Sequence, residues 1–330
     1  MTIQLLPHLV NDPFADPAVY LQIRHEKMAV LFDLGELNNL PTRKLMKIDY
    51  VFVTHCHIDH FIGFDRLLRC VLGRPKTIHL FGPAGFLDHV RGKLAGYTWN
   101  LVGSYPLVLQ ATEIHSRWLY RTTFFCRDGF RDQPVAKISR PNDLILTRPH
   151  FAVRAAIVDH KIPCAAYRLE EPFHLHFRRE ILQRENWPRG PWLSELRRAI
   201  LSGAPADRRF TIAGRDYTLA VLRRRLTITT PGQVIGYASD FHASEANMAK
   251  LTRLLRGCDI LFCEAAFLDE DRERAALTHH LTAGQAATLA RQAGAKKLVL
   301  FHFSPKNHGR AAEYYREAGR IFTGPVDAIC

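Results

Sequence analysis

The chain has 330 residues, 47% of them hydrophobic and 23% charged, and its formal net charge is +13, which together predict a basic globular protein. No apolar run approaches the ~18 residues that span a bilayer, and the N-terminus shows no basic leader before an apolar core, so we expect neither a membrane-spanning helix nor a signal peptide. The seven cysteines include no CxxC pair, which indicates free thiols in a reducing compartment, most simply the cytoplasm.

Short apolar runs rich in β-branched and aromatic residues predict largely buried strands along the chain. These runs are MAVLFDL (28–34), DYVFVTH (49–55), TIHLFG (77–82), FAVRAAIVDH (151–160), QVIGYASD (233–240), DILFCE (259–264) and KLVLFHF (297–303). Helical spacing occurs between some of them, in FIGFDRLLRCVL (61–72), NMAKLTRLLRG (247–257) and TAGQAATLARQAG (282–294). In the last helix Thr282 and Gln285 form a capping box and Gly294 is the stop. This alternation predicts an α/β protein.

One segment differs from the rest in charge and periodicity. Between Arg168 and Thr230 there are 13 arginines against seven acidic residues, and the motif WPRGPW lies at 187–192. We expect residues 172–230 to form an inserted arm within a single domain that spans residues 1–330. The charge fits either a solvated surface or a polyanion-binding surface, since arginine matches phosphate geometry and releases counterions on binding.

The polar residues at the ends of the predicted strands share one feature. Six of the seven strand runs named here carry Asp, Glu or His at or close to their C-terminal end, and the residues concerned are Asp33, His55, His160, Asp240, Glu264 and His302. In layered α/β proteins such strand ends gather along one edge of the sheet, where ligands bind. A single polar residue at this place is unremarkable, but several on separate strands predict a site.

The stretch VFVTHCHIDHFIGF (51–64) contains the pattern HxHxDH directly behind an apolar strand. His55 and His57 are two residues apart, so an extended backbone points both imidazoles the same way. Asp59 and His60 follow where the chain turns towards the next helix. Imidazole nitrogens and carboxylate oxygens suit zinc. The alternative, a polar turn with satisfied hydrogen bonds, does not account for this spacing, and we interpret the stretch as half of a metal site.

These motifs resemble a known family. THCHIDH resembles the metal-binding signature of the metallo-β-lactamase fold, and later segments are similar to its ribonuclease Z branch, endonucleases that trim the 3′ trailer from precursor tRNA. The similar segments are AAIVDHKIPCAAYRLEE (155–171), YASDF (237–241), CEAAF (263–267) and HHLTAGQAATLARQAGAKKLVLFHFSPK (279–306). WPRGPW resembles the Gly-Pro element of the arm that grips tRNA. The resemblance implies a four-layer αβ/βα sandwich of two mixed sheets, and a homodimer.

The resemblance also implies two zinc ions per subunit, although Mn²⁺ or Fe²⁺ can use the same ligands. One ion would be held by His55, His57 and His160, the other by Asp59, His60 and His302, with Asp240 bridging. Asp59 would also orient or deprotonate the attacking water, and Glu264 with His280 would protonate the leaving oxygen. Two alternatives remain open. His280 can have a capping or supporting role beside His279, and Glu264 can orient a ligand histidine.

Four further residues are weaker candidates for substrate contacts. Ser304 and Lys306 can contact the scissile phosphate, and Gly190 and Pro191 of the arm can contact tRNA, as the resemblance implies. The arm residues Trp187 and Trp192 either stack on bases or fill a small local core.

Three functions are compatible with these residues. The first is a zinc-dependent endoribonuclease whose partner is precursor tRNA, with no membrane partner. The second is a hydrolase of a small phosphodiester or thioester on the same scaffold. The altered N-terminal loops, where LNNL follows LFDLGE in place of the family's Gly-Thr-Gln, favour this second function, but it gives no reason for the charge of the arm. The third is a non-catalytic RNA-binding protein with a structural metal site, which the complete ligand set disfavours.

Overall fold

The structure is a computed structural model that describes residues 5–24 and 26–327. The described residues divide into two compact units, residues 171–232 and the remainder, which we call the arm and the core unit. No helix in the described ranges is long and apolar enough to cross a membrane. Six of the seven cysteines lie within those ranges and are free thiols, and Cys330 lies outside them.

The first sheet of the core unit has eight strands among the described residues, which lie side by side in chain order. They are β1 (Leu5–Leu9), β2 (Val19–Ile23), β3 (Ala29–Phe32), β4 (Ile48–Phe52), β5 (Thr77–Pro83), β6 (Val108–Ile114), β7 (Trp118–Phe125) and β8 (Ala136–Ser139). Strands β3 to β6 are parallel and the pairs on both sides are antiparallel, so the sheet is mixed.

The second sheet has seven strands among the described residues, in the order β19-β18-β17-β16-β11-β10-β9. They are β9 (Leu144–Thr147), β10 (Ala152–Asp159), β11 (Pro163–Glu170), β16 (Val234–Ala238), β17 (Ile260–Glu264), β18 (Leu298–Phe301) and β19 (Val326–Asp327). Strands β16 to β19 are parallel, whereas β9, β10, β11 and β16 pair antiparallel. All seven strand runs predicted from the sequence lie in these two sheets.

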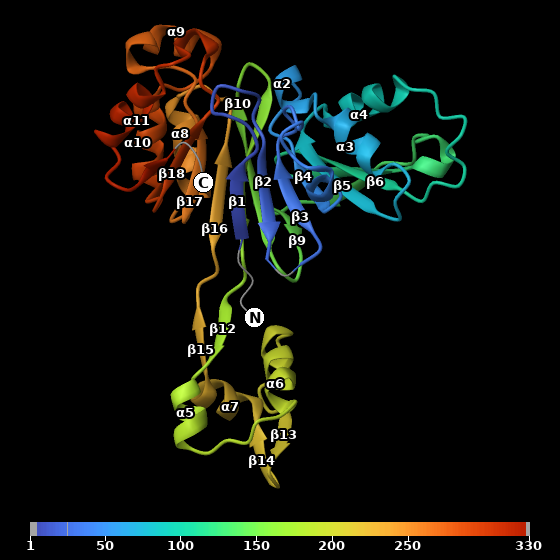
Figure 1. Cartoon of the computed structure of the whole chain (residues 1–330), viewed down its shortest axis with the longest axis vertical. Coiled ribbons are helices and arrows are strands. Elements are labelled where there is room, and N and C mark those ends of the chain that lie inside the picture. The colour runs from blue at the N-terminus through green and yellow to red at the C-terminus, as the bar shows by residue number, and fades with distance from the viewer. Residues whose placement is uncertain (1–4, 25, 328–330) are drawn as a thin grey trace. The chain divides into compact units, whose positions relative to one another are not determined.

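Helices cover the outer face of each sheet (Figure 1). The helices of the core unit among the described residues are α1 (Thr42–Leu45), α2 (Ile58–Phe61), α3 (Phe64–Val71), α4 (Phe86–Ala95), α8 (Glu245–Leu254), α9 (Arg272–Thr278), α10 (Ala283–Ala293) and α11 (Ala311–Gly319). Helices α3 and α4 share an apolar core with the first sheet, and α8, α10 and α11 share one with the second. The predicted capping box of α10 is present, with Thr282 before the helix and Gly294 in the left-handed conformation after it.

Aromatic side chains fill the space between the two sheets. Phe32 of the first sheet stacks on Tyr237 of the second at a ring distance of 5.2 Å, and the ring of Phe52 lies 5.3 Å from that of Tyr167 in a tilted arrangement. All four side chains are fully buried. The layers therefore run helices, sheet, sheet, helices, and the α/β sandwich of two mixed sheets predicted from the sequence is confirmed.

The carboxyl ends of the parallel strands carry the polar residues that the sequence singled out. Asp33 follows β3, Asp240 lies two residues beyond β16, and His302 follows β18. Their φ angles are 55°, 53° and 62°, which places each in the left-handed region. This conformation costs a residue with a side chain roughly 1–2 kcal/mol. It turns the chain abruptly at the strand end, where the polar side chain follows the apolar strand.

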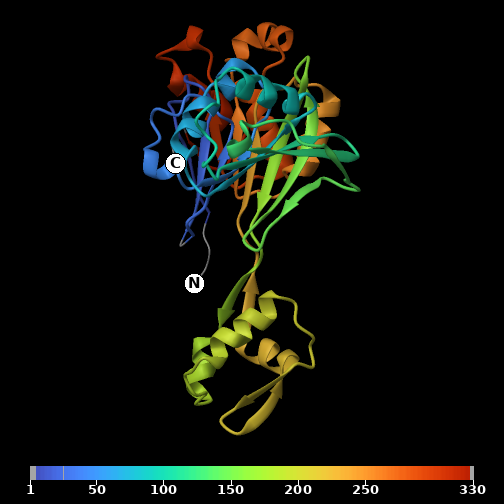
Figure 2. The ribbon, with the colours of Figure 1, turned by 90° about the vertical axis from the view of Figure 1, so that its right-hand side faces the viewer.

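The arm is built from helices and short strands (Figure 1 and Figure 2), and it has a small apolar core of its own. Its elements are β12 (His174–Phe177), α5 (Arg179–Arg184), α6 (Trp192–Leu201), β13 (Arg209–Ile212), β14 (Arg215–Thr218), α7 (Leu219–Leu226) and β15 (Thr227–Thr230). Strands β12 and β15 pair antiparallel, as do β13 and β14. Leu196, Leu222 and Leu226 are fully buried in the core, and Trp187 and Trp192 pack against it. Filling a local core is therefore the role that the contacts of the two tryptophans support.

Candidate metal centre

The turn after β4 presents the HxHxDH motif at the edge of the first sheet. His57 precedes α2 with an extended backbone (φ −64°, ψ 158°), and the first turn of α2 carries Asp59 and His60. His55 and His60 are buried, whereas the Asp59 side chain is 36% exposed. The motif therefore combines two buried imidazoles with a carboxylate that solvent and a substrate can reach.

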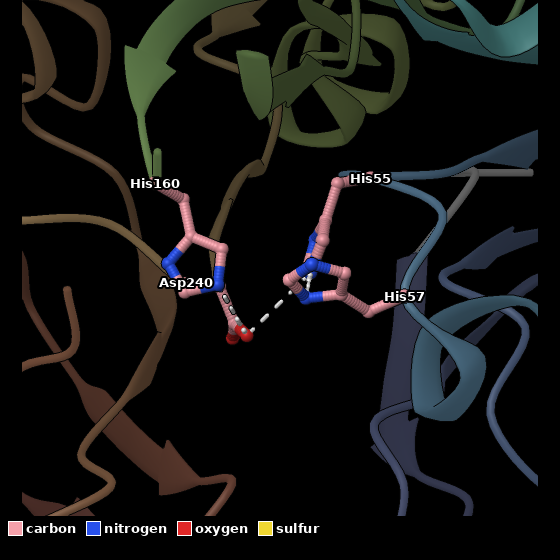
Figure 3. Close-up of side chains that lie close together, drawn as sticks. All are labelled: His55, His57, His160 and Asp240. Atoms are coloured by element: carbon pink, nitrogen blue, oxygen red, sulfur yellow. Dashed lines mark hydrogen bonds and ion pairs between the residues drawn. The ribbon is translucent and has the colours of Figure 1, made fainter. Parts of the chain in front are cut away.

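The first cluster consists of His55, His57, His160 and Asp240, which the structure brings together from both sheets (Figure 3). Nε2 of His55 and Nδ1 of His57 are 2.9 Å apart, and Oδ2 of Asp240 lies 3.7 Å from Nε2 of both His55 and His160. Burial, aided by the neighbouring His60, lowers the pKa of His55 to about 2, so its imidazole is neutral and offers a lone pair. Neutral imidazoles that converge with a carboxylate suit a divalent metal.

The second cluster consists of Asp59, His60 and His302, and Asp240 completes it. Oδ2 of Asp59 lies 3.1 Å from Nε2 of His302 and 3.5 Å from Nε2 of His60. Asp240 contributes both oxygens, with Oδ2 3.3 Å from Nε2 of His60 and Oδ1 3.4 Å from Nδ1 of His302. One carboxylate thus lies between the two clusters.

Two buried imidazole nitrogens of this second cluster lack a hydrogen-bond partner among the described residues, which shows whether a metal would fit there. Nε2 of His60 and Nδ1 of His302 are buried, and neither meets hydrogen-bond geometry with any atom of residues 5–24 and 26–327. Buried polar atoms without a partner are rare in folded proteins. A cation held between these nitrogens and the two carboxylates would give both of them a partner, so the donor set fits a metal.

Glu264 and His280 form a pair beside the clusters. Nδ1 of His280 lies 2.9 Å from Oε2 of Glu264, and Oε1 of Glu264 accepts a hydrogen bond from the Phe241 amide at 2.9 Å. Burial works to lower the pKa of His280, but the Glu264 carboxylate outweighs it and raises the pKa to about 9. His280 is therefore protonated at neutral pH. Its Nδ1 lies 3.9 Å from Oδ2 of Asp240, so the protonated imidazole of His280 lies next to the two clusters.

Backbone and hydroxyl groups orient the histidines. Nδ1 of His160 lies 2.8 Å from the carbonyl oxygen of His279, which itself has a φ of 59°. The Thr54 hydroxyl lies 3.1 Å from Nδ1 of His55. Nδ1 of His160 must donate to the carbonyl of His279, so its Nε2 is left free to face the cluster, and the contact of Nδ1 of His55 with Thr54 turns Nε2 of His55 the same way. The sequence reasoning missed both groups. The position of Thr54 between a strand end and His55 was a usable signal, whereas nothing local marked the carbonyl of His279.

The weaker candidates lie apart from these clusters or are already engaged. Lys306 donates to both carboxylate oxygens of Asp271, at 2.8 and 3.1 Å. Ser304 is half-buried, and its amide donates to the Ala266 carbonyl. Gly190 and Pro191 belong to the arm, where Pro191 directly precedes α6. Substrate contacts by these four residues stay a prediction.

Comparisons with known proteins agree with this geometry. The family model described as "Beta-lactamase superfamily domain" matches residues 13–116 and 208–303. Ribonuclease Z of Deinococcus radiodurans is 32% identical over 94% of this chain and 91% of its own length. Ribonuclease Z of Bacillus subtilis is 29% identical over 94% of this chain and 90% of its own length.

Solved structures share the same fold. Human tRNase Z, short form, has a TM-score of 0.52 at 20% identity, over 93% of this chain and 94% of that chain. The metallo-β-lactamase fold protein YhfI from Bacillus subtilis has a TM-score of 0.56 at 14% identity, over 97% of this chain and 95% of that chain. The chain has the metallo-β-lactamase fold and belongs to the ribonuclease Z family of the β-lactamase superfamily, a family of metal-dependent hydrolases.

Proposed function

We propose that the chain is a zinc-dependent endoribonuclease that removes the 3′ trailer of precursor tRNA. The observation that carries this proposal is the placement of Asp240 between two sets of histidine and aspartate side chains, in a chain of the ribonuclease Z family. Two adjacent ligand sets that share a carboxylate are what a phosphodiesterase with two metal ions needs.

The proposed ligands follow the two clusters. One zinc ion would be held by His55, His57 and His160, a second by Asp59, His60 and His302, and both by Asp240. When bound, such a pair of ions lowers the pKa of a bound water and neutralises charge on the phosphate.

The chain's own residues supply the rest of the chemistry. Asp59 is exposed enough to accept a hydrogen bond from the attacking water and to orient it. In hydrolysis the bond between phosphorus and O3′ of the tRNA body breaks, and O3′ must gain a proton. His280 holds a proton that Glu264 stabilises, so it is the candidate donor to O3′. The products are a tRNA body with a 3′-hydroxyl and a trailer with a 5′-phosphate.

The arm is the proposed binding surface for tRNA. Arg198, Arg223 and Arg224 are exposed and form no ion pair with a described residue, whereas Arg208 pairs with Glu195 and Arg225 with Glu185. Unpaired arginines can bind phosphates without first breaking an ion pair. This surplus of free guanidinium groups favours an RNA substrate over a small phosphodiester or thioester, which would leave the arm's charge without a role.

A pH profile tests the pairing of His280 with Glu264. As a general acid, His280 is active when protonated, so the rate of cleavage should fall as the pH rises through about 9. In Glu264→Gln the carboxylate that raises the pKa of His280 is gone, and the alkaline limb should move to lower pH. The measurement is kcat/KM for precursor tRNA between about pH 6 and pH 10.

Glu113→Gln is the matched control for that profile. Glu113 also pairs with a histidine, at 2.6 Å from His115, and also accepts a backbone amide, that of Leu87. Neither Glu113 nor His115 belongs to the clusters, so this variant should keep the alkaline limb of the wild type. A limb that does not move in Glu264→Gln would contradict the assignment of His280 as the acid.

Incubation of the protein with a 3′-extended precursor tRNA, with and without a chelator, tests the proposal as a whole. We expect one chelator-sensitive cut that leaves a 3′-hydroxyl on the tRNA body. Bound metal without cleavage or tRNA binding would favour a hydrolase of small phosphodiesters or thioesters. Binding without turnover would favour a non-catalytic RNA-binding protein.

Two finer points belong to the same proposal. We propose that the enzyme works as a homodimer and in the cytoplasm, where free thiols such as its described cysteines are stable. Light scattering of the purified protein tests the first point. Fractionation of cells that express the tagged chain tests the second.

A further inference from the structure

Tyr237 is a buried phenol in the aromatic layer between the sheets that the proposed mechanism does not use. It lies in β16, three residues before Asp240, and is fully buried. Its ring stacks on Phe32 at 5.2 Å and on Phe301 at 5.3 Å. Phenylalanine would fill the same volume among these rings, so packing alone does not account for the hydroxyl group.

The hydroxyl of Tyr237 donates to Oδ2 of Asp33 at 2.8 Å, although the two residues lie in different sheets and 204 positions apart. Burial, with the Asp33 carboxylate beside it, raises the pKa of Tyr237 well above its usual value, so the phenol keeps its proton. The hydrogen bond therefore joins β16 to the end of β3 with a fixed direction.

Asp33 is fully buried, and donors from three residues surround its carboxylate. Oδ1 accepts from the Thr54 amide at 2.6 Å, and the Thr54 hydroxyl lies about equally close to both oxygens, at 3.0 Å from Oδ1 and 2.9 Å from Oδ2. Oδ2 also faces Nδ1 of His60 at 2.9 Å and accepts from Tyr237. A carboxylate offers about four lone-pair sites, so these donors occupy the group completely. Its orientation is set by the donors rather than by solvent.

This arrangement fixes the ring of His60. Because Nδ1 of His60 donates to Asp33, Nε2 is the nitrogen that faces Asp59 and Asp240, at 3.5 and 3.3 Å. The partners of a ligand histidine's other nitrogen commonly decide how well that histidine binds metal. Thr54 and Tyr237 both hold Asp33, but only Tyr237 reaches it from the second sheet, which also supplies Asp240 and His302.

We propose that Tyr237 is a positioning residue: its hydroxyl holds Oδ2 of Asp33 in the direction that His60 needs to bind metal with Nε2. The cluster of Asp59, His60 and His302 therefore depends on a contact between the two sheets. In the cluster of His55, His57 and His160, His55 is linked to Asp33 less directly, because the Thr54 hydroxyl stands between them at 2.9 Å from Oδ2 of Asp33 and 3.1 Å from Nδ1 of His55. This inference rests on the proposed metal site and adds a residue that determines the affinity of one half of it.

Tyr237→Phe tests the proposal, and Tyr167→Phe is its matched control. Tyr167 is also a fully buried phenol of the second sheet, with its ring 6.0 Å from Phe32. Its hydroxyl donates to the backbone carbonyl of Val53 at 2.6 Å rather than to a carboxylate that holds a histidine. Both variants remove one buried hydroxyl from the same aromatic layer, so a merely structural role predicts the same effect for both.

The experiment titrates the metal-free, full-length proteins with Zn²⁺ against a chromophoric chelator, and with Co²⁺ followed by its visible absorption spectrum. We expect Tyr237→Phe to weaken one of two binding steps about tenfold and to change the Co²⁺ spectrum of that step. Tyr167→Phe should leave both steps within about threefold of the wild type. Similar thermal stability of the two metal-free variants would show that the difference arises at the site.

Two results would overturn the inference alone. One is a Tyr237→Phe protein that titrates like a wild type with two binding steps, and the other is an equal weakening in both variants. A wild-type protein that binds neither ion would instead overturn the metal site, and the proposed function with it. The wild-type titration therefore separates failure of the inference from failure of the proposed function.

Discussion

Asp240→Asn is expected to abolish cleavage of precursor tRNA and to remove bound metal from both halves of the site. The carboxylate lies within 3.3–3.9 Å of imidazole nitrogens from His55, His60, His160, His280 and His302. Asparagine has nearly the same size but no charge, so neither metal would keep its shared anionic ligand. Asparagine also tolerates the left-handed backbone at this position, where φ is 53°, so the strand end should keep its conformation. Cleavage should fall by at least ~10³-fold, since bound metal would activate the attacking water.

The measurements for Asp240→Asn are metal content by elemental analysis, cleavage rate and tRNA affinity. The affinity should persist, because the arm carries the proposed RNA contacts. Asp159→Asn is the control, since Asp159 ends β10 directly before His160 but its side chain is 61% exposed and faces His279 rather than the clusters. An Asp240→Asn protein that retains metal and cleavage would contradict the proposal that Asp240 is a ligand of both metals.

The strands and the metal-site residues could be predicted because both leave a pattern in short stretches of neighbouring residues. Strands buried on both faces are nearly continuous apolar runs, and parallel strands bring their carboxyl ends to one edge. The runs at 49–55, 233–240 and 297–303 show both features. Asp240 and His302 could therefore be placed near the HxHxDH motif without any knowledge of the contacts between the sheets.

Other parts of the fold lack such a local signal. Strands β6 and β7 pair antiparallel and contain polar residues such as Gln110, Thr112 and Arg121 among apolar ones, so no continuous apolar run marked them. Their strand character depends on neighbours in the sheet, which the sequence does not display.

Contacts between distant residues also decide several roles. Lys306 was a candidate for phosphate binding, but its charge is engaged by Asp271 through a contact that only the tertiary fold creates. Tyr237 was part of a predicted strand, and nothing in YASDF shows that its hydroxyl reaches Asp33. The role of the Tyr237 hydroxyl therefore could not be assigned from the sequence.

Removing the arm is expected to weaken precursor tRNA binding by at least ~10-fold and to make the remaining binding less sensitive to salt. The antiparallel register of β12 and β15 places residues 174 and 230 opposite one another, so a tight turn can replace residues 175–229. The core unit keeps both of its apolar cores in this variant, since neither includes arm residues. Hydrolysis of bis(p-nitrophenyl) phosphate should therefore persist while tRNA cleavage at low substrate concentration falls.

A matched pair of charge reversals separates the arm's charge from its bulk. Arg223→Glu with Arg224→Glu changes two exposed arginines of the arm, and Arg253→Glu with Arg256→Glu changes two exposed arginines of the core unit. Neutralising a phosphate contact changes the slope of log K against log salt by about 0.7–0.9, so losing two contacts lowers it by up to ~2. Fluorescence anisotropy of labelled precursor tRNA at several salt concentrations measures this slope. We expect the arm reversals to lower the affinity and the slope more than the core reversals do. Equal effects of both pairs would mean that tRNA binding follows the net charge of the whole chain, and the arm would then have no special part in it.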